Sequence, residues 1–385
     1  MLDGKAVRIG INALYLLPGR VGGSEIYIRN LVKHLAGTGG NNAFVIFTNQ
    51  ESAGAFDDAG PGVEIVLCPI QASSRPVRIL WEQLVLPFQI LRHKIDILFS
   101  AGMTAPLLCP IPSVLAIFDL LHVLQPQNFP RVYLLFLKTI IYLSAKSADG
   151  IVTISRKVMD DILKFYRVPG VKIAVTYLAV DHNTFFPREA KEVEDVRAKY
   201  SLPERFILYA AASLPHKNHA RLFEALRILK ERGRGTALVL TGARDKGYDA
   251  VAQIIRKMGL ETDVVFTGWL PFEDIAPIYC ASDALVFPSL NEGFGMPIIE
   301  AMACGVPVTC SSIEPLPEVA GDAAYYFDPY DPVSIADGIT AVISDSDLRR
   351  VLIEKGFRRA AKFSWENTAL QTLEFIMSYG EGSKN

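Results

Sequence analysis

Residues 291–300 (NEGFGMPIIE) place two carboxylates, Glu292 and Glu300, on either side of a glycine-bearing turn. The apolar run before them, 284–287, predicts a buried strand. The residues after them predict a short helix with Pro297 in its first turn and Gly305 just past its end. Free N–H groups and the positive dipole end of such a helix favour an anion. The stretch therefore suits a phosphate with hydroxyl-rich groups on both sides, as in a nucleotide sugar.

A second loop, 213–219 (SLPHKNH), also lies between a predicted strand and a predicted helix. Lys217 is unexpected there, because cations prefer the C-terminal end of a helix. An anion held between Lys217 and the helix would explain its place, and the alternative is a solvated lysine. His216 and His219 are either ligand contacts or local caps, and neither has the neighbours that a metal site needs.

Four glycines that follow predicted strands are further candidates for ligand contact. Gly22 and Gly23 follow the first predicted strand and let the backbone approach a ligand closely, although a flexible turn explains them too. Their spacing does not match the G-x-G-x-x-G dinucleotide fingerprint. Gly242 and Gly268 each follow a predicted strand, where a base or ribose could lie on exposed backbone.

Asp119 closes the predicted strand 113–117, and His122 follows three residues later. A carboxylate and a histidine could serve acid–base or hydroxyl-binding roles, and a purely structural role is an equal alternative. No Asp-x-Asp pair follows a strand, and residues 344–347 (SDSD) are typical of a surface turn. We therefore expect no metal and no other cofactor.

The length of 385 residues is natural for two domains, and a net charge of −2 gives no nucleic-acid signature. The charge is uneven: residues 1–185 hold 17 Lys and Arg against 13 Asp and Glu, and the remainder holds 22 against 28. A basic first half could contact an acidic membrane surface or an anionic acceptor, or the difference is ordinary surface variation.

The five cysteines show no C-x-x-C spacing, which favours a reducing cytoplasm over a disulfide framework. No signal peptide is visible, and no apolar run reaches the ~18–20 residues of a membrane span. The nearest candidate, 132–143, is short and contains Lys138, so it predicts a buried helix rather than a membrane anchor.

Short apolar runs alternate with amphipathic stretches along the chain, which predicts parallel α/β sheets covered on both faces. The polar stretch 182–200 is the candidate linker between two doubly wound domains, with the ligand site in a cleft between them. Expected strands lie at 7–11, 43–48, 63–68, 96–99, 113–117, 150–154, 206–210, 237–241, 264–267, 284–287 and 306–310. Expected helices lie at 24–35, 81–92, 132–145, 156–166, 219–232, 249–258, 272–281, 296–304 and 365–379.

Together these motifs resemble the retaining GT-B glycosyltransferases of family 4 (group 1). The hallmark is E-x₇-E, here Glu292 and Glu300. Further matches are Lys217, 266–268 (FTG), 305–308 (GVPV), 317–319 (PEV), 321–324 (GDAA), Ser155, 180–181 (VD), Phe185, Pro187 and 22–23 (GG). The resemblance implies two Rossmann-like domains: 1–185 on the acceptor side, 186–362 binding the nucleotide sugar, and a C-terminal helix within 363–385 packing back toward the first.

The resemblance also implies roles for individual residues. Glu292 would contact the donor sugar hydroxyls, Glu300 the ribose, and Lys217 the diphosphate, with Asp119 as a third catalytic residue. Donor contacts would come from Gly22, Gly23, Ser213, His216, Gly242, Gly268, Phe294, Gly295 and Met296. Two departures stand out. Residues 211–213 (AAS) replace the Gly-Arg pair that many members carry before the lysine, and Phe118 precedes Asp119 where members often have histidine.

The resemblance implies a metal-independent, retaining hexosyltransferase. The form of residues 215–218 (PHKN) resembles mannosyltransferases of bacterial surface-polysaccharide assembly and favours GDP-mannose as donor. The expected acceptor is a carbohydrate or a lipid-linked glycan, and the expected location is the cytoplasm, with peripheral contact of the first domain at the inner face of the membrane. The alternatives are a non-catalytic sugar-nucleotide binder, or an epimerase or phosphorylase on the same fold.

Overall fold

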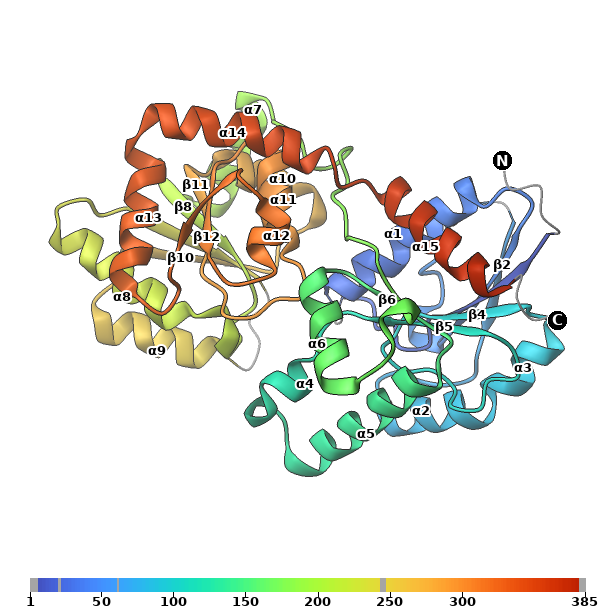
Figure 1. Ribbon diagram of the computed structural model, residues 1–385. Helices are drawn as coiled ribbons and strands as arrows, with labels where there is room; N and C mark the ends of the chain where they lie inside the picture. Colours follow the sequence, from blue (N-terminus) through green and yellow to red (C-terminus); the bar gives the residue numbers. More distant parts are fainter. Residues whose placement is uncertain (1–5, 20–21, 61, 243–246, 381–385) are drawn as a thin grey trace. The chain divides into compact units, whose positions relative to one another are not determined.

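The computed structural model describes residues 6–19, 22–60, 62–242 and 247–380. Contacts between Cα atoms divide the chain into two compact units. Unit 1 comprises Met1–Leu178 with Trp365–Asn385, and unit 2 comprises Ala179–Ser364. Each unit is an α/β domain built on one parallel sheet, as the alternating pattern predicts (Figure 1).

The sheet of unit 1 has seven strands in the order β3-β2-β1-β4-β5-β6-β7, all paired in parallel. The strands are β1 Arg8–Asn12, β2 Ala43–Thr48, β3 Val63–Leu67, β4 Ile97–Ser100, β5 Ser113–Ile117, β6 Gly150–Thr153 and β7 Ile173–Val175. The chain winds outward from β1 in one direction and then restarts beside it at β4. The strand order therefore reverses between β1 and β4.

Helices cover both faces of this sheet. They are α1 Gly23–Thr38, α2 Arg75–Leu84, α3 Leu86–Arg92, α4 Leu121–Leu124, α5 Arg131–Ser147, α6 Arg156–Tyr166 and α15 Trp365–Gly380. Crossovers between parallel strands are right-handed, so the reversal of direction puts α1 on one face and α2, α3, α5 and α6 on the other. The C-terminal helix α15 packs along α1, on the face away from α2, α3 and α5 (Figure 1).

The sheet of unit 2 has six strands in the order β10-β9-β8-β11-β12-β13. They are β8 Phe206–Ala210, β9 Ala237–Thr241, β10 Val264–Gly268, β11 Ala284–Phe287, β12 Val308–Ser311 and β13 Ala324–Phe327. The order reverses between β8 and β11. Both strands are almost entirely buried, because helices cover both faces.

The helices of unit 2 also form two layers. They are α7 Ala190–Tyr200, α8 His219–Glu231, α9 Tyr248–Met258, α10 Phe272–Ala281, α11 Met296–Ala303, α12 Leu316–Ala320, α13 Pro332–Ser344 and α14 Ser346–Ala360. Helix α13 packs on α8, whereas α14 packs on α11 and α7 packs on α10.

Three sequence predictions differ from the structure. The linker expected at 182–200 contains helix α7. A capping box between Glu189 and Glu192 begins this helix, and its buried residue Val196 packs it onto unit 2. The single helix expected at 81–92 is two helices, since Pro87 lies in the first turn of a new helix, α3. The run 132–143 forms most of α5 but is buried only at Ile140 and Ile141, and Val132 is 86% exposed.

Candidate active site

Two loops of unit 2 lie side by side where its strand order reverses. Strands β8 and β11 pair directly, with Ile207 opposite Ala284 and Leu208 opposite Leu285. The loop after β8 carries Lys217, and the loop after β11 carries Glu292. In open parallel sheets the carboxyl ends of strands at such a reversal form the usual ligand site.

Lys217 and Glu292 form an ion pair across this reversal. The Nζ atom of Lys217 lies 2.6 Å from Oε1 of Glu292, and the side chains are 16% and 13% exposed. The ammonium group also lies 5.5 Å from the ring centroid of Phe287. A lysine has three N–H donors, and a carboxylate has two oxygens. The pair therefore keeps donors and an acceptor oxygen for a ligand.

Hydrogen bonds hold the two loops together. The Leu290 N–H donates to the His216 carbonyl at 2.8 Å, and the Tyr209 hydroxyl donates to the Lys217 carbonyl at 2.7 Å. Asn218, with a positive φ of 62°, donates from Nδ2 to the carbonyls of Pro288 and Pro329 at 3.0 and 2.8 Å. These bonds fix the backbone on both sides of Lys217, and the ion pair with Glu292 orients its ammonium group.

The two histidines of the first loop are buried and neutral near pH 7. Burial lowers the pKa of His216, and the adjacent Lys217 charge lowers it further. The pKa of His219 falls to about 4 for the same reasons. The His219 ring lies 5.1 Å from that of Tyr209 and 6.3 Å from that of Phe223, so His219 packs in the core beneath the loop.

Helix α11 begins at the second loop. Gly295 precedes it with a φ of 102°, and an added Cβ there would lie 2.8 Å from Cδ2 of Leu316. The Phe294 ring is buried against Phe363, with centroids 5.6 Å apart. Position 294 can therefore meet a ligand through its backbone rather than its ring. Met296, half-buried, is the first residue of the helix.

Glu300 lies one turn into α11 and has a partner that sequence reasoning missed. The Tyr279 hydroxyl, from α10, donates to Oε2 of Glu300 at 2.8 Å. Burial raises the pKa of Glu300 to about 7, although the bond from Tyr279 opposes that rise. The only sequence signal was a tyrosine in the apolar stretch 275–281.

The remaining candidates of unit 2 lie at the same edge of the sheet. The Gly242 N–H, after β9, donates to the Gly268 carbonyl at the end of β10, at 3.0 Å. A Cβ on Gly242 would lie 2.7 Å from the Ala211 carbonyl oxygen, so the backbones after β8 and β9 are in close contact. Ser213 is buried in the loop after β8. The structure thus places ten of the thirteen candidate residues at the carboxyl edge of one sheet.

The other three candidates belong to unit 1. Asp119 follows β5 and accepts a hydrogen bond from the Leu121 N–H at 2.9 Å, and the ring of Phe118 packs edge-on against Tyr27. His122 is buried, bonds to the Tyr166 hydroxyl at 2.7 Å and has a pKa lowered by burial to about 4, so it is a core residue.

Gly22 and Gly23 are exposed at the start of α1, after β1. Residues 20 and 21 of the same predicted loop lie outside the described residues.

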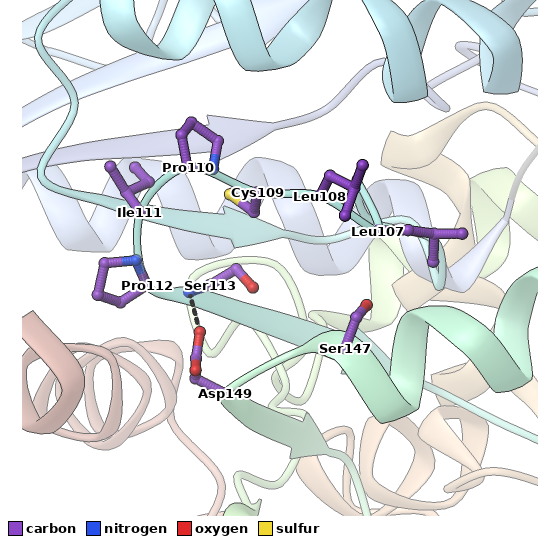
Figure 2. Close-up of a pocket in the computed structure, with 9 residues that line it drawn as sticks. All are labelled: Leu107, Leu108, Cys109, Pro110, Ile111, Pro112, Ser113, Ser147 and Asp149. Carbon is purple, nitrogen blue, oxygen red and sulfur yellow. Dashed lines mark hydrogen bonds between the residues drawn. The ribbon is translucent and has the colours of Figure 1, made fainter.

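A hollow of about 440 Å³ lies elsewhere in unit 1 (Figure 2). Residues 107–113, Ser147 and Asp149 line it, and the Ser113 N–H donates to Oδ2 of Asp149 at 2.8 Å. The hollow lies at the amino ends of β5 and β6, the edge opposite Asp119. Ligand sites of parallel sheets lie at the carboxyl edge, so we assign the hollow no part in the candidate site.

No three His, Cys, Asp or Glu side chains group as metal ligands in the described part of the chain. In the same residues, no helix is both long and apolar enough to cross a membrane.

Comparisons with known proteins agree with this geometry. The sequence model "Glycosyl transferases group 1" matches residues 192–359, and "Glycosyltransferase Family 4" matches residues 21–184. The chain belongs to the group 1, family 4 glycosyltransferases.

Its relatives include O-antigen chain mannosyltransferase B of Escherichia coli, 34% identical over 64% of this chain and 65% of that protein. Another is the serotype-specific mannosyltransferase WbdA of Escherichia coli, 30% identical over 62% of this chain and 30% of that protein. The matches thus span less than two thirds of the length of these relatives.

Solved structures share the fold. A glycosyltransferase from Rickettsia africae superposes with a TM-score of 0.76 at 19% identity, over 99% of this chain and 100% of that one. Anabaena HepE, solved with UDP and glucose, gives a TM-score of 0.74 at 20% identity, over 97% and 100%. The two parallel sheets are those of the GT-B fold.

Proposed function

We propose that this protein is a retaining glycosyltransferase that transfers mannose from GDP-mannose to a carbohydrate or lipid-linked glycan in surface-polysaccharide synthesis. The observation that carries the proposal is the Lys217–Glu292 pair at the strand reversal of unit 2. The similarity to O-antigen mannosyltransferases supports mannose as the sugar.

Each part of the donor has a proposed partner. The two remaining N–H donors of Lys217 would bind the diphosphate, and the N-terminal end of α11 would add its dipole. The second carboxylate oxygen of Glu292 would accept hydrogen bonds from sugar hydroxyls. Glu300, which accepts a hydrogen bond from the Tyr279 hydroxyl, would also accept hydrogen bonds from the ribose hydroxyls.

The proposed reaction is a front-face displacement. A bond forms between the acceptor hydroxyl oxygen and C1 of the sugar while the bond from C1 to the diphosphate oxygen breaks. The hydroxyl proton passes to the departing diphosphate oxygen on the same face, so the configuration at C1 is retained. The rigid site around Lys217 stabilises the charge that develops on the leaving diphosphate. The role of Asp119, toward the sugar or the acceptor, rests on the family resemblance.

We also propose that transfer needs no metal ion. A leaving diphosphate needs positive charge nearby, which a divalent cation or preorganised protein groups can supply. Lys217 and the start of α11 are such groups. The departure at 211–213 removes the arginine that many members carry, so Lys217 bears more of this task here.

Thermal-shift measurements with GDP, UDP, ADP and their sugars test donor binding. A ligand at 100 times its Kd stabilises the folded state by about 2.7 kcal/mol, which gives a clear shift. Transfer is then tested with GDP-mannose as donor and a mannan oligosaccharide as acceptor, by NMR of the new anomeric centre. Donor consumption without acceptor would indicate an epimerase, and binding without any turnover would indicate a binder. A melting point unmoved by every nucleotide contradicts the proposal.

A further inference from the structure

Helix α5 exposes an apolar face that the sequence pattern placed in a core. Val132 is 86% exposed and Leu135 is 69% exposed, and Phe136, Tyr142 and Leu143 are exposed on the same side. Only Ile140, Ile141, Ser144 and Ala145 are buried. Contiguous exposed apolar surface of this kind is unusual in a protein and marks an interaction site.

Helices α2 and α3 expose a second apolar stripe. It consists of Val77, Leu80, Leu84, Phe88 and Leu91, which recur every three or four residues and are each at least 54% exposed. The opposite side of α3, with Leu86 and Ile90, packs into the core with residues of strands β2 and β4. The stripe therefore faces away from the protein.

The two apolar stripes belong to one layer. Right-handed crossovers place α2, α3 and α5 on the same face of the sheet, opposite α1 and α15 (Figure 1). The N-terminal ends of α2 and α5 are in contact. The Arg75 guanidinium of α2 donates to the Tyr133 hydroxyl of α5 and lies 5.5 Å from the centroid of the Tyr133 ring. We name the outward side of this layer the α2–α3–α5 face.

The charge of this face is uniformly positive. Arg75, Arg92, Arg131 and Lys146 are exposed on its helices, and Lys138 is half-buried. The three helices are fully described and contain one acidic residue, Glu82, which is 1% exposed and accepts bonds from Asn12 and Thr104. Helix α15, on the opposite face of the same unit, carries exposed Glu366 and Glu374 and no lysine or arginine.

We infer that the α2–α3–α5 face docks on the surface of an anionic phospholipid bilayer, with its helices in the plane of the interface. Apolar side chains flanked by lysine and arginine match the acyl boundary and the anionic headgroups of such a surface. A protein partner of ordinary composition carries both positive and negative charges. It would therefore complement this positively charged face less well than an anionic bilayer does. The membrane inference does not depend on the transfer reaction, so an experiment that contradicts one leaves the other standing.

Flotation of the full chain with phosphatidylcholine vesicles, with and without phosphatidylglycerol, tests the inference. We expect binding to the anionic vesicles that weakens with salt, and little binding to phosphatidylcholine alone. The double variant Phe88→Ser, Leu91→Ser should bind roughly 10- to 100-fold more weakly. Arg92→Gln and Arg131→Gln should each weaken binding about fivefold.

Leu370→Ser is the matched control, because Leu370 is exposed on α15 in the same unit. It should bind as the wild type does. Since all these positions are exposed, unchanged circular dichroism and melting points should show intact folds. Equal binding to both vesicle types, or undiminished binding by the Phe88, Leu91 double variant, overturns the inference. The inference is also overturned if sedimentation shows that the wild type is a dimer that does not bind vesicles, and that the double variant is a monomer.

Discussion

The Nζ atom of Lys217 lies 2.6 Å from Oε1 of Glu292, although the two residues are 75 positions apart in the chain. They meet because β8 and β11 are neighbours in the sheet where the winding reverses. Both side chains are mostly enclosed, so neither charge is well solvated alone. Each side chain thus holds the other in place where a diphosphate sugar would bind.

Glu292→Gln should separate catalysis from binding. The amide keeps the shape of the side chain but weakens the hydrogen bonds that a carboxylate accepts from sugar hydroxyls. Transfer from GDP-mannose should fall roughly 10- to 100-fold, as expected for losing a charged hydrogen-bond partner, while GDP binds nearly as before. Steady-state kinetics and calorimetry measure the two effects. Glu354→Gln, on exposed α14, is the control. Full activity of Glu292→Gln would rule out its proposed role.

Donor binding should strengthen as the pH rises through 7. The pKa of Glu300 is about 7, above its ordinary value, so the carboxyl of the free protein is largely protonated below that pH. Only the carboxylate accepts bonds from both ribose hydroxyls, so affinity for GDP-mannose should increase from pH 6 to pH 8. The diphosphate of GDP-mannose does not titrate in this range. Calorimetry across the range should show no such rise in Glu300→Gln.

Tyr279→Phe provides a second check of the same carboxyl. The Tyr279 hydroxyl lowers the pKa of Glu300, so its loss should move the midpoint of the affinity curve to higher pH. The raised pKa also means that the folded state holds this proton more tightly than the unfolded state. Its contribution to stability is therefore present below the unfolded pKa and lost as the pH rises through about 7. A midpoint unchanged in Tyr279→Phe would contradict this assignment.

Gly295→Ala should destabilise unit 2 more than Gly268→Ala does. Both glycines have positive φ, which costs a non-glycine residue about 1–2 kcal/mol. At Gly295 the new Cβ would also lie 2.8 Å from Leu316, whereas at Gly268 nothing lies within 4 Å. Chemical denaturation of both variants measures the difference. Equal losses of stability would show that the Leu316 contact relaxes without cost.

Transfer should be insensitive to chelators. If Lys217 and the start of α11 carry the charge of the leaving diphosphate, EDTA should leave the rate unchanged and added Mg²⁺ or Mn²⁺ should not raise it. The assay is GDP release from GDP-mannose in the presence of acceptor. An activity lost in EDTA and restored by a divalent ion would contradict metal independence.

The strands that position the site were predictable, because a strand covered on both faces is a short apolar run such as 206–210 or 284–287. The loop positions of Lys217 and Glu292 followed from the same alternation. The bond from Tyr279 to Glu300 was not predictable, since it joins two helices whose packing only the tertiary structure defines.

Two segments have structures that differ from their sequence predictions for physical reasons. Helix α7 looks like a linker because it is polar and only Val196 is buried, so its amphipathic signal is weak. The run 132–143 looks like a buried helix because apolar residues indicate contact with something apolar without indicating what. None of the described residues covers the exposed side of α5, which leads to the membrane inference.

The most direct test of the account is GDP binding to Lys217→Ala, measured by calorimetry beside guanosine, which has no phosphate. If Lys217 binds the diphosphate, GDP should bind roughly 10- to 100-fold more weakly, the range for a charged hydrogen bond, and guanosine should be unaffected. Lys230→Ala is the control, because that lysine is exposed on α8 and pairs with Asp263. GDP binding to Lys217→Ala with wild-type affinity would contradict the proposal that this ion pair forms the diphosphate-sugar site.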